Sequence, residues 1–178
     1  MSHVNPVEPG AAIHHSDPFA APEVSKSPVR RLRGRLAAPV TLWTAPGPTG
    51  LTVSSMLVAD GEPGRVLGLV DAESDFWDAA ATAGRFAVTP LGAGDQQLAD
   101  RFAGLMPAPG GLFAGGEWVV TEYGHVPATA GTWAGCRLDA HRAYGWGLLV
   151  EATVESVRLD GTPAPLVHYR GRYHRLDG

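Results

Sequence analysis

From Pro39 onward, the chain is a series of short apolar runs rich in β-branched residues, separated by turns such as "APGPTG" and "DGEPG". Runs of this length and composition between Gly- and Pro-containing turns are typical of β-strands. We predict about eight strands, at residues 39–45, 50–55, 65–71, 85–91, 117–123, 133–140, 146–159 and 165–176.

The longest of these segments, 146–159, alternates with a period of two, so alternate side chains are expected on opposite faces of a sheet. One face would hold Leu148, Val150, Ala152 and Val154, and the other Glu151, Thr153 and Glu155.

The last segment, 165–176, alternates in the same way. It predicts a basic face of His168, Arg170, Arg172 and His174, with Tyr169 and Tyr173 opposite. Two interpretations are open: this face meets a nucleotide phosphate, or it is solvated.

Two segments between the strands have the start and stop signals of helices. In "SDFWDAAATAG", Ser74 or Asp75 is the expected N-cap and Gly84 the terminator. In "DQQLADRFAG", Asp95 and Gly104 have the same roles. Many strands with few helices predict a mainly β fold, an antiparallel barrel or sandwich rather than a doubly wound sheet.

A third helix is expected in "SPVRRLRGRL", where Leu32 and Leu36 lie four residues apart. Its arginines are either a phosphate contact or a solvated face; they are Arg30, Arg31, Arg33 and Arg35. Residues 1–27 are rich in Pro, Ala and Ser without any period, which indicates a flexible or extended arm before a single domain at 28–178.

Composition narrows the function classes. The net charge of −4 provides no overall attraction for nucleic acid or an anionic membrane surface. No apolar run approaches the roughly 20 residues of a membrane span, and the N-terminal residues do not form a secretory signal. The single cysteine, Cys136, lies in a predicted strand, where a small buried hydrophobe is expected. One cysteine excludes an intramolecular disulfide and suits a reducing compartment, so we expect a cytoplasmic protein.

Common catalytic motifs are absent from the sequence. There is no GxxxxGK[ST] phosphate loop, no GxSxG elbow and no HExxH zinc motif, and "GAGDQQ" at 92–97 lacks the third glycine of a dinucleotide fingerprint. We therefore predict no metal site.

One group of polar residues remains to be explained. The run "GLTVSSM" holds Thr52, Ser54 and Ser55 at a strand end, and Ser74 begins a helix whose free amides favour an anion. Either these groups hold a phosphorylated ligand, or they end a strand and cap a helix.

Several short motifs occur in a defined order along the chain. They are Pro39-Val40-Thr41, Gly50 followed by Thr52 to Ser55, Pro63, Ser74, "GRFAV" at 84–88, "LADRFAG" at 98–104 and "PLVHYRGRY" at 165–173. This set, over about residues 28 to 176, resembles the flavin reductase-like family. The resemblance implies an antiparallel split β-barrel with a few short helices at the connections, and a homodimer that binds FMN, rather than FAD, near the subunit interface.

The resemblance also implies site residues. Thr52, Val53, Ser54 and Ser55 would face the isoalloxazine and ribityl chain through backbone and hydroxyl groups. The ribityl or phosphate end would be approached by Asp71, Ala72 and Ser74, and Phe102 would lie near the pocket.

A departure from the family concerns the reaction. Many NAD(P)H-using members carry Gly-Asp-His before the long strand, where this chain has Gly145-Trp146-Gly147. Tyr144 or Trp146 would either stack on a flat substrate or pack at the barrel rim.

The function implied by the resemblance is an NAD(P)H:flavin oxidoreductase, or the reductase component of a two-component monooxygenase. The missing Gly-Asp-His leaves open a flavin-binding electron carrier without its own NAD(P)H site. A third possibility is the same barrel with another flat ligand, such as deazaflavin or haem.

Overall fold

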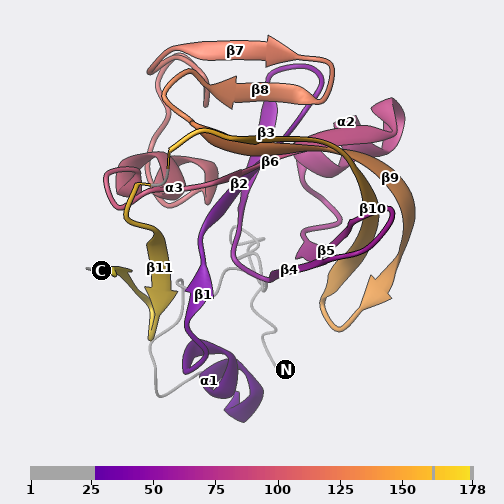
Figure 1. The fold of residues 1–178 in the computed structure, drawn as a ribbon. Coiled ribbons are helices and arrows are strands. Elements are labelled where there is room, and N and C mark those ends of the chain that lie inside the picture. Colours follow the sequence, from indigo (N-terminus) through magenta and orange to yellow (C-terminus); the bar gives the residue numbers. More distant parts are fainter. Residues whose placement is uncertain (1–26, 162, 177–178) are drawn as a thin grey trace, which may run out of the picture.

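The computed structural model describes residues 27–161 and 163–176. Its largest element is a curled antiparallel sheet in the order β3-β2-β6-β9-β10-β5-β4 (Figure 1). The strands of this sheet are β2 Thr41–Ala45, β3 Thr49–Val53, β4 Met56–Ala59, β5 Arg65–Val70, β6 Arg85–Pro90, β9 Thr132–Tyr144 and β10 Gly147–Leu159.

The two edge strands of this sheet, β3 and β4, are consecutive in the chain and are joined only by Ser54 and Ser55. Three extended residue steps, from Val53 to Met56, span at most about 11 Å. The sheet must therefore curl until its edges approach each other, and no ladder joins β3 to β4 among the described strands. The result is a barrel that is split at Ser54 and Ser55.

Two small sheets flank the barrel. One has the order β1-β11-β12, with β1 at Ala38–Pro39, β11 at Leu166–Tyr169 and β12 at Arg172–Arg175; the other pairs β7, Trp118–Thr121, with β8, Gly124–Pro127. The prediction of a mainly β antiparallel split barrel is confirmed. Strands β4 and β8 were not predicted, and β1 shares only Pro39 with the predicted segment 39–45.

Local signals predicted the helices well. Helix α2, Asp75–Ala83, is capped by Ser74, whose Oγ accepts a hydrogen bond from Trp77 N at 3.2 Å. It ends at Gly84, whose φ of 67° lies in the left-handed region that glycine tolerates. Helix α3, Gln96–Phe102, follows Asp95, whose carboxylate accepts from the amide of Gly92 rather than capping the helix.

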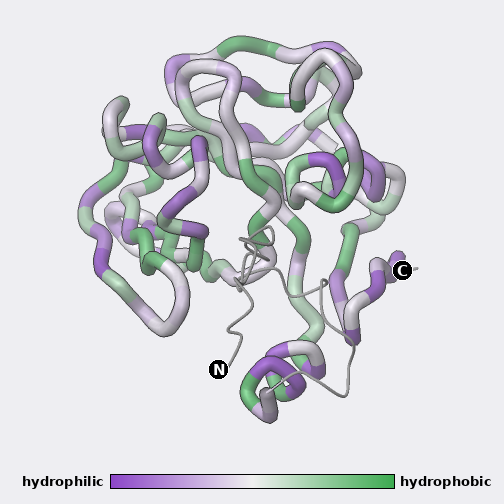
Figure 2. The backbone as a smooth tube through the Cα atoms, turned by 180° about the vertical axis from the view of Figure 1, so that it is seen from behind, coloured by the Kyte–Doolittle hydropathy of each residue, from purple (hydrophilic) through white to green (hydrophobic). Residues whose placement is uncertain are grey.

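The predicted arginine-rich helix is α1, Pro28–Gly34, which projects from the barrel body (Figure 1). It buries no residue, and Leu32 and Leu36 are 62% and 63% exposed. Figure 2 shows hydrophilic and hydrophobic residues side by side along it. Most of the predicted arm at 1–27 lies outside the described residues, so the boundary between arm and domain stays a prediction.

An aromatic cluster forms the core between the sheet and α2. Trp43 stacks on Phe86 with ring centroids 4.8 Å apart, and Phe76 meets both rings edge-on. All three are fully buried. The indole Nε1 of Trp43 donates to Thr41 Oγ1 at 3.0 Å, and this hydroxyl donates to the carbonyl of Val53 at 2.6 Å, so the buried polar groups are satisfied.

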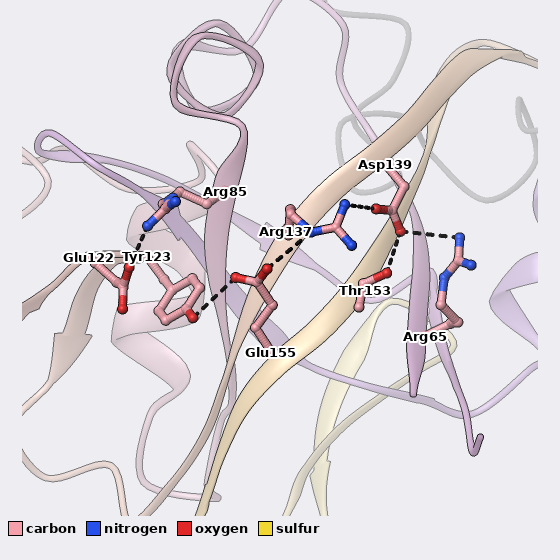
Figure 3. A network of polar contacts seen from close by, with 8 residues as sticks. All are labelled: Arg65, Arg85, Glu122, Tyr123, Arg137, Asp139, Thr153 and Glu155. Atoms are coloured by element: carbon pink, nitrogen blue, oxygen red, sulfur yellow. Dashed lines mark hydrogen bonds and ion pairs between the residues drawn. The ribbon is translucent and has the colours of Figure 1, made fainter. Parts of the chain in front are cut away.

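A network of charged and polar side chains crosses the outer surface of β5, β10, β9 and β6 (Figure 3). Asp139 accepts from Arg137 at 2.6 Å and Thr153 at 2.7 Å, and forms an ion pair with Arg65 at 3.2 Å. Glu155 accepts from Arg137 Nε at 3.0 Å. The carboxylates thereby separate arginines that neighbouring strands bring close together.

The two faces predicted for 146–159 are found in β10. Leu148, Val150, Ala152 and Val154 belong to the aromatic core or pack against it, whereas Thr153 and Glu155 belong to the network on the outer surface. The register between β9 and β10 shifts at Glu151/Ala152 and again at Val154/Ser156. At these irregularities Asp139 and Glu155 have no paired residue on the opposite strand, as in β-bulges.

The prediction of a single strand at 165–176 is wrong. Residues 166–175 form a hairpin, β11 and β12, that turns at Arg170 and Gly171 with φ values of 51° and 78°. Two consecutive positive φ values are typical of a tight hairpin turn. His168 is therefore paired with Tyr173, and Tyr169 with Arg172, so the predicted basic face does not exist.

Candidate functional site

The split in the barrel opens onto a cleft of about 560 Å³. Ser54 and Ser55 lie on its wall, half-buried, and Ser55 is fixed because its carbonyl accepts from the amide of Leu69 at 2.9 Å. This volume is within the usual range of about 300–1,000 Å³ for small-molecule sites.

The apolar wall of the cleft comes from the outward side of β5. Val66 and Val70 point into the core, so the alternating residues Leu67 and Leu69 face outward and line the cleft. The cleft is also lined by Leu149 of β10, which pairs with Leu69 of β5, and by Met56 and Leu57 of β4. Two hydroxyls beside a leucine-rich wall suit a flat ligand with a polar edge.

The other side of the cleft is formed by α1 and the C-terminal hairpin. Gly34 and Gly171 are among its lining residues, and the carbonyl of Gly34 accepts from the amide of Arg170 at 2.8 Å. Pairing of β1 with β11 holds the same two segments together.

The remaining residues of the "TVSS" run point elsewhere. Thr52 Oγ1 donates to the carbonyl of Ala99 in α3 at 2.7 Å, and Val53 is 3% exposed in the aromatic core. Any contact of these two residues with a ligand in the cleft would involve their backbone. Phe102 is also buried, edge-on to Phe113 at 5.0 Å, and does not line the cleft.

The residues expected near the phosphate lie at the start of α2. Ser74 Oγ donates to the carbonyl of Asp71 at 2.7 Å, and Asp71 Oδ1 accepts from the amide of Glu73 at 2.9 Å. Asp71, Ala72 and Ser74 thus form a hydrogen-bonded turn, and none of them lines the cleft.

The two aromatic candidates both lie in the β9–β10 hairpin, but only one of them lines the cleft. Tyr144, at the end of β9, lines the cleft, and the guanidinium of Arg142 lies 5.1 Å from its ring centroid. Trp146 is 94% exposed in the turn and is not a lining residue.

A phosphate contact was left open from the sequence for the arginines at 30–35 and for Arg170, but it was not predicted that they share one cleft. Arg30, Arg33, Arg142 and Arg170 all line it. Burial lowers the pKa of the Arg33 guanidinium, and the like charge of Arg30 lowers it further. The signal for Arg30 and Arg33 was present in the arginine-rich helix, whereas nothing marked Arg142.

The described residues contain no group of three or more His, Cys, Asp or Glu side chains that could hold a metal ion. Burial raises the pKa of the Cys136 thiol to about 12, and the negative charge of Glu155 adds to the shift, so this residue is an inert core side chain.

The family model described as "Flavin reductase like domain" matches residues 33–177. The chain belongs to the flavin reductase-like family. FMN reductase (NADH) RutF 1 of Methylorubrum extorquens strain PA1 is 30% identical over 166 residues, which cover 90% of this chain and 81% of the relative. FMN reductase (NADH) RutF of Variovorax paradoxus strain S110 is 28% identical, with 93% and 94% covered.

Among solved structures, nitrilotriacetate monooxygenase component B from Mycobacterium thermoresistibile superposes with a TM-score of 0.75 at 26% identity. The match covers 84% of this chain and 85% of that one. The family resemblance stated from the sequence is therefore confirmed. In the described part of the chain, no helix is long and apolar enough to cross a membrane.

Proposed function

We propose that this protein is a flavin reductase that holds FMN in the cleft at the barrel split and transfers hydride to it from NAD(P)H. The observation that carries this proposal is the cleft itself, with Ser54 and Ser55 at the split and a wall of outward-facing leucines. The relatives named FMN reductase (NADH) favour FMN as flavin and NADH as donor.

The residues present fit a flavin. The Ser54 and Ser55 hydroxyls would bond the polar edge of the ring, while Leu67, Leu69 and Leu149 would pack on its face and exclude water. Bound flavin would supply the redox chemistry, because the protein contributes orientation and surroundings.

The other residues expected at the flavin remain part of this proposal. Thr52 and Val53 would contribute backbone groups. Phe102 would support β3, because its ring lies so close to Gly50 that a Cβ on this glycine would be 2.7 Å from the ring. Asp71, Ala72 and Ser74 would act at the ribityl or phosphate end, where the amides of a helix N-terminus favour an anion.

The test is a titration of FMN fluorescence followed by anaerobic mixing with NADH. We expect quenching with a micromolar dissociation constant, then bleaching of the flavin absorbance. Absence of quenching at these concentrations would refute flavin binding at this site.

The second candidate is a flavin-binding electron carrier without its own NAD(P)H site. It is favoured by the hairpin turn, where exposed Trp146 and the following Gly147 stand in place of the family's Asp-His. Flavin that binds but is not bleached by NADH or NADPH would decide for the carrier. Rapid bleaching would decide for the reductase, and loss of that rate in Trp146→Ala would assign Trp146 to nicotinamide stacking.

We also propose a homodimer with the flavin near its interface. Large apolar side chains are exposed at or beside the cleft, including Leu36 at 63%, Leu57 at 51% and Val58 at 62%. Such a patch favours association. Light scattering should give a dimer for the wild type and a monomer for Leu36→Ser with Leu57→Ser. The control Val120→Ser, on β7 and 72% exposed, should remain dimeric.

Two further features complete the proposal. An oxygenase that consumes reduced flavin is a suitable partner, because the neighbouring structure is named as a monooxygenase component. A cytoplasmic location is supported by the single, buried Cys136, which suits a reducing compartment.

A further inference from the structure

Four arginines from three distant parts of the chain line one cleft. Arg30 and Arg33 come from α1, Arg142 from β9, and Arg170 from the turn between β11 and β12. No Asp or Glu is among the described residues that line the cleft. The whole chain has a net charge of −4, so this concentration of positive charge is a local feature.

A backbone hydrogen bond brings Arg170 to the helix that carries Arg30 and Arg33. The amide of Arg170 donates to the carbonyl of Gly34, so the hairpin turn is tied to the end of α1. Arg170 is the only non-glycine residue with positive φ in the described chain, a conformation that is uncommon for side chains of its size. An arginine side chain therefore occupies a turn position at which glycine is usual.

Aromatic rings steady two of the guanidinium groups. Arg142 lies 5.1 Å from the Tyr144 ring centroid and Arg170 lies 5.7 Å from that of Tyr169. Among the described residues, no carboxylate forms an ion pair with Arg33, Arg142 or Arg170. Their hydrogen-bond donors are therefore available to a ligand.

Desolvation first, and then the like charge of Arg30, lowers the pKa of the Arg33 guanidinium, so the positive charges at this cleft repel one another. Arginine remains protonated at neutral pH, so this repulsion is not removed by loss of a proton. An anion with several oxygens would relieve it, and the planar guanidinium matches phosphate oxygens in a two-pronged geometry.

We infer that Arg30, Arg33, Arg142 and Arg170 form a phosphate-binding collar that recognises the phosphate of a nucleotide ligand in this cleft. The phosphate belongs either to the flavin, in which case Asp71, Ala72 and Ser74 act at the ribityl end, or to the pyrophosphate of the nicotinamide dinucleotide. This inference rests on the proposed function for the identity of the ligand, but not for the class of anion.

The sequence offers matched controls for the collar. Arg31 and Arg35 lie on or beside α1 but do not line the cleft, and Arg172 is outside the cleft although it lies two residues from Arg170. The test compares Arg30→Gln with Arg33→Gln against Arg31→Gln with Arg35→Gln, and Arg170→Gln against Arg172→Gln. In each comparison the two variants lose the same charge from neighbouring positions, at α1 or in the β11–β12 hairpin.

Three measurements are made on the purified full chain after circular dichroism has shown that each variant is folded. They are the dissociation constants of FMN and of riboflavin, which lacks the phosphate, and kcat/KM for NADH with riboflavin as acceptor. Charge-assisted hydrogen bonds are strong enough that each lost arginine should cost about tenfold.

If the collar holds the flavin phosphate, the cleft variants lose FMN affinity at least about tenfold and keep their riboflavin affinity. If it holds the dinucleotide, FMN affinity is kept and kcat/KM for NADH falls by a similar factor. Either result supports the collar. It is overturned if both quantities stay unchanged, if FMN and riboflavin lose affinity equally, or if the control variants lose as much.

Failure of the proposed function would be recognised separately. A wild type that binds no flavin refutes the reductase, and the collar is then tested by calorimetry with inorganic pyrophosphate. Tighter binding to the wild type than to Arg30→Gln with Arg33→Gln supports the collar, and equal binding overturns it.

Discussion

Gly68 of β5 lies directly against the indole of Trp43, where a Cβ would stand 2.7 Å from Cη2 and 2.9 Å from Cζ2 of the ring. The indole cannot retreat, because it stacks on Phe86 at 4.8 Å. Leu67 and Leu69, on either side of Gly68, form the wall of the cleft. The aromatic core therefore determines the position of that wall.

The first prediction is that Gly68→Ala destabilises the fold. Overpacking a well-filled core costs about 1–3 kcal/mol, and urea unfolding followed by tryptophan fluorescence measures the loss. Gly64→Ala is the control, because a Cβ there has its nearest contact at an ordinary 3.8 Å. If both variants unfold at the same urea concentration as the wild type, the close contact is not rigid.

A second prediction concerns the polar network on the outer surface. Asp139, whose side chain is 18% exposed, accepts from three partners, whereas Asp160 forms one ion pair with Arg158 and is 65% exposed. Asp139→Asn should lower the free energy of unfolding by about 1–3 kcal/mol. Asp160→Asn should change it by less than about 1 kcal/mol. Equal effects in urea unfolding would show that the network contributes nothing beyond single surface pairs.

The third prediction is a loss of stability at high pH. Burial raises the pKa of Cys136 from 9.0 to about 12 in the folded chain, so the unfolded thiol ionises first. The stabilisation is complete below pH 9 and declines as the pH rises from there toward 12, by at most about 1.4 kcal/mol per pH unit.

The raised pKa of Tyr123, caused first by burial and then by the charge of Glu122, acts in the same direction. The comparison is therefore between the wild type and Cys136→Ala, unfolded in urea at pH 8 and pH 10. The variant should lose less stability over this interval, and identical losses would contradict the assignment. The native thiol should also be inert to Ellman's reagent at pH 8.

Local chemistry explains which parts of the fold were predictable. Ser74 and Gly84 delimit α2 through interactions within one turn of the helix, so the sequence identifies both ends. The terminal hairpin was missed because basic residues recur at every second position of the sequence from His168 to His174, across the turn. Arg170 followed by Gly171 was the available signal, although a turn beginning with arginine is uncommon.

The site was less predictable because the cleft depends on long-range docking. The helical period places Arg30 and Arg33 on a different face of α1 from Arg31. Which face meets the cleft depends on the hydrogen bond between the amide of Arg170 and the carbonyl of Gly34, and this contact is not visible in the sequence. Likewise, Thr52 and Ser54 look equivalent in the sequence. Only the placement of α3 shows that the Thr52 hydroxyl already has a partner in Ala99.

The last prediction separates these hydroxyls by function. Ser54→Ala with Ser55→Ala should weaken FMN binding by about tenfold, since two hydrogen bonds together contribute about 1–3 kcal/mol. The melting temperature should hardly change, because both residues lie in a connection between strands. Thr82→Ala is the control, as its hydroxyl donates to the carbonyl of Asp78 on the exposed side of α2 and does not line the cleft. If FMN affinity survives the double substitution, these hydroxyls serve only to end β3 and begin β4, and the flavin ring is held by the leucine wall alone.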